Sequence, residues 1–322
     1  MGETNYIFYQ KEIAKVEAHT INGNYKEAVL IFNNLLSQFT FIFPRDAYLA
    51  AQLASFTDQK EIAVKFLIEA IKSGSSFKIL LQNLHIRNVI NDIGIVEFEK
   101  IYFQYRKKDI PQELKQEMLS LYHKDNEYLT RYSKIYNIFH KKKILTEWDE
   151  FSLVAGVKVR EIIRKTGFPS YKILGTENSG DYKKGQFKDL ISSHLAVILL
   201  AHDQENNKEI MIVLLEELKK GNINARTLAF IRDIITYKRI RNGDLKQDEY
   251  DLYAYGVFSF LDKNTEEISS YNKVRSEIGL CDIEIEKEKH FMNKKYKSST
   301  LWYKKNRNFK QPFFHFFLED IC

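Results

Sequence analysis

The pair of residues best suited to chemistry is a histidine followed directly by an acid. His202 and Asp203 end an apolar stretch, and residues 187–201 are expected to form a helix whose buried face leads to them. A carboxylate near a histidine makes a general base, because the acid fixes the tautomer of the ring and raises its basicity. Adjacent residues of a helix point about 100° apart, so the orienting acid is expected to be Asp233 or Asp125. The competing interpretation is that His202 only caps the helix, where the helix dipole favours a cation.

The sequence shows no metal-ligand spacing and no cofactor motif. His194 lies eight positions before His202, and no His-x-x-x-His occurs. Cys281 and Cys322 are 41 positions apart, too isolated for a zinc ribbon or a disulfide framework. We therefore expect no metal, no cofactor, a reducing compartment, and cysteines that act as small buried apolar residues.

The N-terminal third contains a repeated pattern in residues 23–36 and 58–71. With an offset of 35 positions, the two segments align Ala28 with Ala63, Phe32 with Leu67, and Leu35 with Ala70. A small residue lets two helices approach closely and a large one fills the groove beyond it. Over residues 10–74 the chain therefore resembles the tetratricopeptide superfamily of helix pairs. We find no third copy with the same spacing, and we expect residues 77–105 to form a degenerate capping pair.

The resemblance to tetratricopeptide repeats implies an array of helices with a concave face that binds a peptide or a partner protein. The alternative is that the repeat only supports the rest of the chain. The segment YRKKDIP follows the repeat, and its charges before Pro111 are a typical helix-stop signal. We place the domain boundary there.

Six short motifs follow in order between residues 119 and 285: LYHKDNEYLTRY, TGFPSYKILG, LAVILLAHDQ, LAFIRDII, YDLYAYGVF and VRSEIGL. In order and spacing they resemble a bacterial family catalogued as domain of unknown function 6624. The residues that match the family pattern are Asp125, Arg131, Gly167, Pro169, Gly175, His202, Asp233, Tyr255, Gly256, Arg275, Gly279 and Leu280.

Several polar positions of that family pattern are changed in this chain. Phe168 stands where Trp is usual, Ala201 where Gln is expected, Ile234 where Arg is expected, and Val257-Phe258 where Thr-Gln is expected, while Asp203 follows His202 directly. An enzyme that loses donors aimed at developing charge loses most of its rate. These changes favour a binding or inactive relative.

A basic, aromatic-rich segment lies near the C-terminal end of the sequence. Residues 289–310 hold eight Lys and Arg and no acid, which is +8 against a whole-chain net charge of +6 and leaves −2 for the remainder. Basic residues among aromatic ones are typical of a groove for single-stranded nucleic acid. The candidate residues are Lys294, Lys295, Lys297, Trp302, Lys304, Lys305 and Arg307. The alternative is a solvated tail anchored by its aromatic residues, with the apolar end docked on the protein.

The composition favours a mainly α fold, because only 4 Pro and 13 Gly interrupt a chain that is 44% hydrophobic. We expect tetratricopeptide-like hairpins over residues 1–110, a helical domain over 111–285, and the basic segment over 286–322. No apolar run reaches the roughly 18 residues of a membrane span. A cytoplasmic location is therefore expected, with a trimmed signal peptide left open.

Three functions are consistent with these features. The first is a bacterial interaction module that binds a protein or peptide. The second is a hydrolase-like enzyme with His202 as base, Asp233 or Asp125 as the orienting acid, and Arg131 or Arg275 clamping an anion, since Arg matches carboxylate and phosphate. Tyr255 and Asp203 are further binding candidates in that pocket. The third is nucleic-acid binding through the basic segment.

Overall fold

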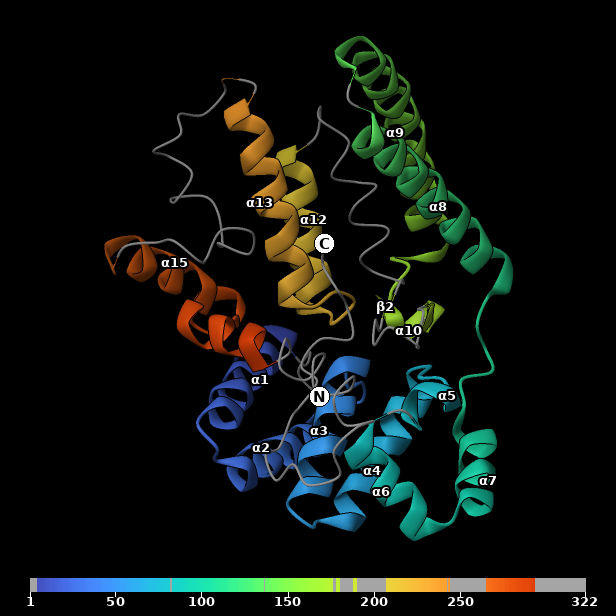
Figure 1. Cartoon of the computed structure of the whole chain (residues 1–322), viewed down its shortest axis with the longest axis vertical. Coiled ribbons are helices and arrows are strands. Elements are labelled where there is room, and N and C mark those ends of the chain that lie inside the picture. Colours follow the sequence, from blue (N-terminus) through green and yellow to red (C-terminus); the bar gives the residue numbers. More distant parts are fainter. Residues whose placement is uncertain are drawn as a thin grey trace.

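The protein is mainly α-helical, as the composition predicts (Figure 1). The structure is a computed structural model that describes residues 5–81, 83–135, 137–175, 178–179, 188–189, 207–241, 243 and 265–292. In these ranges the only strands are β1 (Asn178–Ser179) and β2 (Lys188–Asp189), which pair antiparallel, with Asn178 opposite Asp189. No helix in the described part of the chain is both long and apolar enough to cross a bilayer.

Four helices form two consecutive hairpins at the start of the chain. They are α1 (Tyr6–Ile21), α2 (Tyr25–Gln38), α3 (Pro44–Phe56) and α4 (Lys60–Lys72). Each helix packs against the next. Ala28 and Ala63 are fully buried, and the rings of Phe32 and Phe66 meet edge to face with centroids 5.7 Å apart. The recurring alanines therefore lie inside the array, where a small side chain lets the helices approach.

A third helix pair continues this array, with a short helix before it. The elements are α5 (Phe77–Leu80), α6 (Leu84–Ile93) and α7 (Ile95–Tyr105). The second helices α2, α4 and α7 begin at residues 25, 60 and 95, so the offset of 35 holds twice. Phe98 occupies the position of Ala28 and Ala63; it is buried and its ring stacks on Phe77 at 5.4 Å. The sequence predicts a degenerate capping pair over residues 77–105, and in α7 an aromatic residue stands in place of the recurring alanine.

The remaining helices form a second body. A long hairpin of α8 (Gln112–Lys134) and α9 (Ile138–Thr166) is followed by the one-turn α10 (Tyr171–Leu174), then by α12 (Asn207–Lys219), α13 (Ala225–Arg241) and α15 (Thr265–Ile278). Residues 283–292 are also helical. Pro111 caps the start of α8, where its missing N–H leaves no donor unpaired. In Figure 1 the tip of the α8–α9 hairpin projects away from α1–α7.

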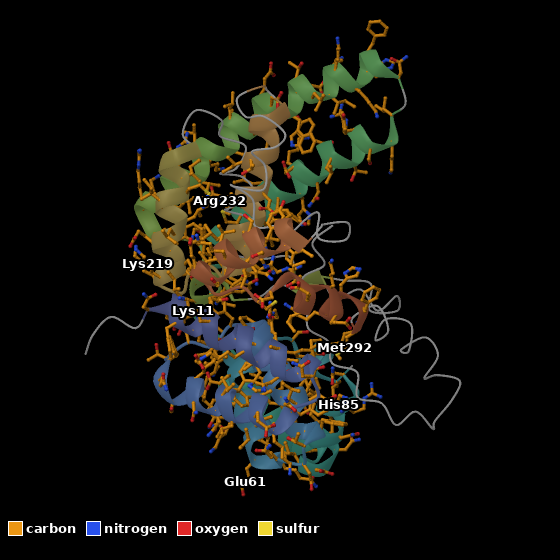
Figure 2. All side chains as sticks on the ribbon, turned by 90° about the vertical axis from the view of Figure 1, so that its left-hand side faces the viewer. Lys11, Glu61, His85, Lys219, Arg232 and Met292 are labelled. Atoms are coloured by element: carbon orange, nitrogen blue, oxygen red, sulfur yellow. The ribbon has the colours of Figure 1, made fainter. Side chains whose placement is uncertain are left out.

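Two clusters of buried apolar residues correspond to the two bodies. The first combines residues of α1–α7 with Tyr171 of α10, and the second combines residues of α8, α9, α12, α13 and α15. Helix α1 lies at the boundary and packs against α12 and α15 as well as α2. Figure 2 shows this boundary at Lys11, with Lys219 of α12 nearby and Glu61 at the far end of the hairpins.

Two glycines bring the second body close to α1. Gly221 follows α12 with φ +72°, and a Cβ there would lie 2.5 Å from the ring of Tyr6. Gly279 follows α15 with φ +82°, and a Cβ there would lie 2.5 Å from the backbone N of Lys11. Both positions need glycine for the positive φ and for the close approach. The two bodies are therefore in direct backbone-level contact along α1.

Candidate functional site

Several residues that the sequence singles out lie outside the described residues. They are His202, Asp203, Tyr255 and the basic set Lys294, Lys295, Lys297, Trp302, Lys304, Lys305 and Arg307. Their roles stay predictions. The described candidates are Asp125, Arg131, Asp233 and Arg275.

Asp125 and Arg131 both lie on α8 and contact side chains of α9. The buried Asp125 accepts a hydrogen bond at Oδ1 from the indole Nε1 of Trp148 at 2.7 Å. Arg131 pairs through Nη2 with Oε2 of Glu147 at 3.0 Å, and its side chain is 42% exposed. Both interactions hold the two helices of the hairpin together.

Asp233 and Arg275 are buried in the second body. Asp233 on α13 is 0% exposed and Arg275 on α15 is 1% exposed. The Nε of Arg275 donates to the backbone oxygen of Cys281 at 2.7 Å, and its Nη2 lies 3.5 Å from Oε2 of Glu286. Arg275 is therefore part of a larger group of buried charges. We call this group the buried charge cluster, and its members are Glu17, Arg45, Asp46, Arg226, Arg275, Glu286 and Lys289.

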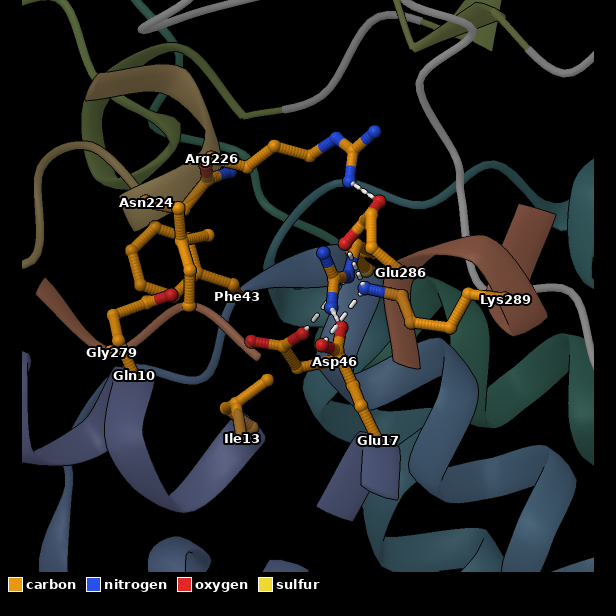
Figure 3. Close-up of a pocket in the computed structure, with 12 residues that line it drawn as sticks. Gln10, Ile13, Glu17, Phe43, Asp46, Asn224, Arg226, Gly279, Glu286 and Lys289 are labelled. Carbon is orange, nitrogen blue, oxygen red and sulfur yellow. Dashed lines mark hydrogen bonds and ion pairs between the residues drawn. The ribbon is translucent and has the colours of Figure 1, made fainter. Parts of the chain in front are cut away.

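The buried charge cluster joins the two bodies of the protein (Figure 3). Lys289 is the bridge: its Nζ lies 2.8 Å from Oε2 of Glu17 on α1 and 3.0 Å from Oε2 of Glu286. Arg45 at the start of α3 pairs with Glu17 and, at 3.2 Å, with Asp46. On the other side Arg226 of α13 pairs with Glu286. The chain of ion pairs thus runs from the first hairpins to α13 and to residues 283–292.

The charges of the cluster stabilise one another against burial. Burial alone would raise the pKa of Glu286, but attraction by Arg226, Lys289 and Arg275 outweighs it and holds that pKa well below its usual value. Burial would likewise raise the pKa of Glu17, yet Lys289 and Arg45 keep it lowered. Both carboxyl groups are therefore ionised at neutral pH.

In the cluster member Asp46 and in two neighbours of the cluster, Tyr9 and Cys281, burial outweighs the attraction of nearby cations and the pKa is raised. Burial raises the pKa of Asp46 in spite of the nearby Arg45, and Asp46 accepts a hydrogen bond from the hydroxyl of Tyr9 at 2.8 Å. Burial and the charge of Asp46 raise the pKa of Tyr9 well above its usual value. Burial also raises the pKa of the Cys281 thiol, whose Sγ lies 3.5 Å from Glu286. An un-ionised thiol is a poor nucleophile, so Cys281 is a packing residue, as the sequence predicts.

The cavity beside the cluster is too small for a substrate. It has a volume of about 20 Å³ and is lined by cluster residues together with Gln10, Ile13, Phe43 and Gly279, among others. A space of this size holds about one water molecule. Among the described residues no group of His, Cys, Asp and Glu side chains is arranged to hold a metal ion. The cluster therefore has the properties of a structural connection between the two bodies.

Two larger and more open pockets lie beside Lys107, where the ends of the hairpin helices meet residues 106–110, α8 and α10. The first has a volume of about 390 Å³ and includes Tyr102, Ile71 and Ile110; its basic lining residues are Arg106, Lys107, Lys108 and Lys115. The second has a volume of about 360 Å³; its basic lining residues are Lys72, Lys107 and Lys172, next to Phe41 and Glu69. We call them the Lys107 pockets. The run Arg106-Lys107-Lys108 follows the end of α7 and also lines the first cavity.

The second pocket is bounded by an ordered lysine of α10. Lys172 donates through Nζ to the backbone oxygen of Lys220 at 2.5 Å and lies 4.7 Å from the ring centroid of Tyr6. Burial lowers the pKa of Lys172. Glu69 is the acid in this pocket and pairs with Lys72 at 2.7 Å. The described residues of both pockets thus present an excess of positive charge.

Comparison of the chain with family models, curated proteins and solved structures gives no match.

Proposed function

We propose that the protein is an interaction module that binds a protein or peptide at the Lys107 pockets, where the N-terminal hairpins meet α8 and α10. The observation that carries the proposal is the position of these two pockets. Their volumes lie in the range of ligand pockets, and they lie side by side because both include Lys107. The cavity at the buried charge cluster, by contrast, has room for about one water molecule.

The described acid and base candidates support a binding role more than a catalytic one. Asp125 and Arg131 bind side chains of α9, and Arg275 binds Cys281 and Glu286. A general acid or base must reach the reacting group within hydrogen-bond distance. Side chains already bound to partners on their own body are less suited to that task.

A peptide selection tests the proposal. Random peptides displayed on phage are selected on the immobilised full chain, and the enriched peptides are then measured against two variants. Thr40→Trp places a large ring at the rim of the second Lys107 pocket, where Thr40 is exposed. Glu61→Trp places the same ring on an exposed position at the far end of the hairpins.

We expect the selected peptides to bind wild type and Glu61→Trp alike and to bind Thr40→Trp at least tenfold more weakly, since the indole fills the pocket. Circular dichroism checks that both variants keep the helical fold. If no peptide is enriched, or if Thr40→Trp binds as well as Glu61→Trp, the proposal is wrong.

A further inference from the structure

We infer that the ligand of the Lys107 pockets is an extended peptide segment rich in Asp and Glu, with an apolar side chain among its acids. This inference rests on the proposed function and names the chemistry of the partner.

The charge of the first pocket carries the inference. The described residues that line it include four cationic side chains and no acid. Lys107 and Lys108 make no ion pair with any described residue, while Lys115 is 7% exposed and sits in the wall. Asp109 is exposed and belongs to neither pocket lining. A carboxylate that enters this pocket would meet the side chains of Lys107 and Lys108, which no described acid neutralises.

Backbone hydrogen bonds hold the chain on either side of Lys107. The N–H of Arg106 donates to the carbonyl of Tyr102 at 2.8 Å at the end of α7, and the N–H of Lys115 donates to Pro111 at 2.9 Å. Gly175 has φ +66° and brings the end of α10 against the segment between α7 and α8. A Cβ at this position would lie 3.2 Å from Ile110 and 3.5 Å from Lys107. A fixed backbone lowers the entropy lost on binding.

The aromatic residues of the pockets favour a peptide over a nucleic acid. The ring of Tyr102 packs against Phe77 at 5.3 Å and against Phe103 at 5.8 Å. The ring of Phe41 packs against Phe43 at 5.3 Å and lies 5.5 Å from the ammonium of Lys172. Single-stranded nucleic acid binds through bases that stack on open ring faces. Rings already packed in this way suit apolar side chains better than bases.

Each pocket suits a different kind of peptide side chain. The first, with Arg106, Lys107 and Lys108, suits acidic side chains. The second has Phe41 and Leu36 in its lining and suits an apolar side chain. An extended peptide points successive side chains to opposite sides, so separate pockets read alternate residues. Lys107 borders both pockets and can contact an acid at either position.

Fluorescence anisotropy of a short labelled peptide of Glu, Leu and Ser, titrated with the full chain, tests whether the Lys107 pockets bind an acidic peptide. We compare Lys107→Gln/Lys108→Gln with a matched control, Lys26→Gln/Lys65→Gln, which removes the same charge from two exposed positions outside both pockets. Two lost charge contacts should weaken binding about tenfold. The control should stay within about twofold of wild type, and replacing Glu by Gln in the peptide should abolish binding.

Three results would overturn the inference. Equal weakening in both double variants would show a long-range effect of net charge only. Tighter binding of a single-stranded oligonucleotide that depends on Lys107 and Lys108 would assign the pockets to nucleic acid. Displacement of the peptide by inorganic phosphate at concentrations below those of the peptide would assign them to a free anion.

Failure of this inference is separable from failure of the proposed function. If the phage selection yields peptides that are sensitive to Thr40→Trp but are not enriched in Asp and Glu, the pockets bind peptides and the inferred chemistry is wrong. If no selected peptide depends on Thr40, both fail.

Discussion

The substitution Glu286→Gln tests the buried charge cluster with almost no change of shape. The Glu286 side chain is 4% exposed and faces three cations: Arg226, Arg275 at 3.5 Å and Lys289 at 3.0 Å. Glutamine keeps one acceptor oxygen and removes the negative charge. The three cations then remain in place without the negative charge that offsets the cost of burying them.

The expected loss of unfolding free energy follows from these contacts. Removing one partner of a buried ion pair destabilises a protein by about 3 to 5 kcal/mol. Lys289 keeps Glu17 at 2.8 Å, and the Arg226 side chain is 17% exposed, so water relieves part of its charge. We therefore expect the lower end, about 3 kcal/mol, which is a large share of the stability of a typical protein.

Urea unfolding followed by circular dichroism measures this loss. The matched control is Glu288→Gln, which removes the same charge from an exposed position two residues further along the same helix. The free energy of unfolding of the control should lie within about 0.5 kcal/mol of that of wild type. A loss below about 1 kcal/mol for Glu286→Gln, or a loss equal to that of the control, would refute the reasoning that these charges are buried and mutually dependent.

Two further outcomes follow from the same contacts. The folded pKa of Glu286 lies well below its unfolded value of about 4.5, so its ionised form stabilises the fold above that pH, and the stabilisation is lost as pH falls through the folded pKa. Urea titrations at several pH values should show the gap between wild type and Glu286→Gln shrinking below about pH 4.5, and a constant gap would contradict the assignment. Gly279→Ala should destabilise by about 2 to 5 kcal/mol, because it combines a positive φ with a clash against the backbone of Lys11. Its control in thermal melts is Gly167→Ala, which has φ +81° and nothing within 4 Å of the added methyl; equal losses would show that the contact with α1 is not tight.

The sequence predicts the mainly α-helical fold well, because its apolar pattern is local and periodic. Alanine and large apolar residues recur at an offset of 35 in α2 and α4. In α7 the offset persists, but Phe98 replaces the alanine because this helix ends the array and packs on Phe77. The third helix pair is therefore recognised by the position at which α7 begins and not by the size of the residue at position 98.

The buried charge cluster is much harder to predict, because its members come from five helices that lie far apart in the sequence. Glu17 and Lys289 are 272 positions apart, and each resembles an ordinary solvent-exposed charge in its own segment. In the sequence Lys289 belongs to the basic segment. In the structure it is buried and pairs with Glu17 and Glu286. Among the sequence motifs, only VRSEIGL, with Arg275 and Gly279, contains a residue of the buried charge cluster. The motif does not indicate which residues pair with Arg275.

The Lys107 pockets are predictable in part. The basic run before Pro111 is visible, and its charge is a signal for an anionic partner. The second cavity depends on Tyr171 and Lys172 of α10, which lie more than 60 positions further along the chain. No local pattern places α10 beside Lys107.

Hydrogen–deuterium exchange of the full chain with and without a selected peptide tests the central claim most directly. We expect the peptide to slow amide exchange in residues 39–42 and 106–110, which border the Lys107 pockets, and to leave the far ends of α8 and α9 unchanged. Protection confined to the α8–α9 hairpin, or no protection at either pocket while the peptide is bound, would contradict the account.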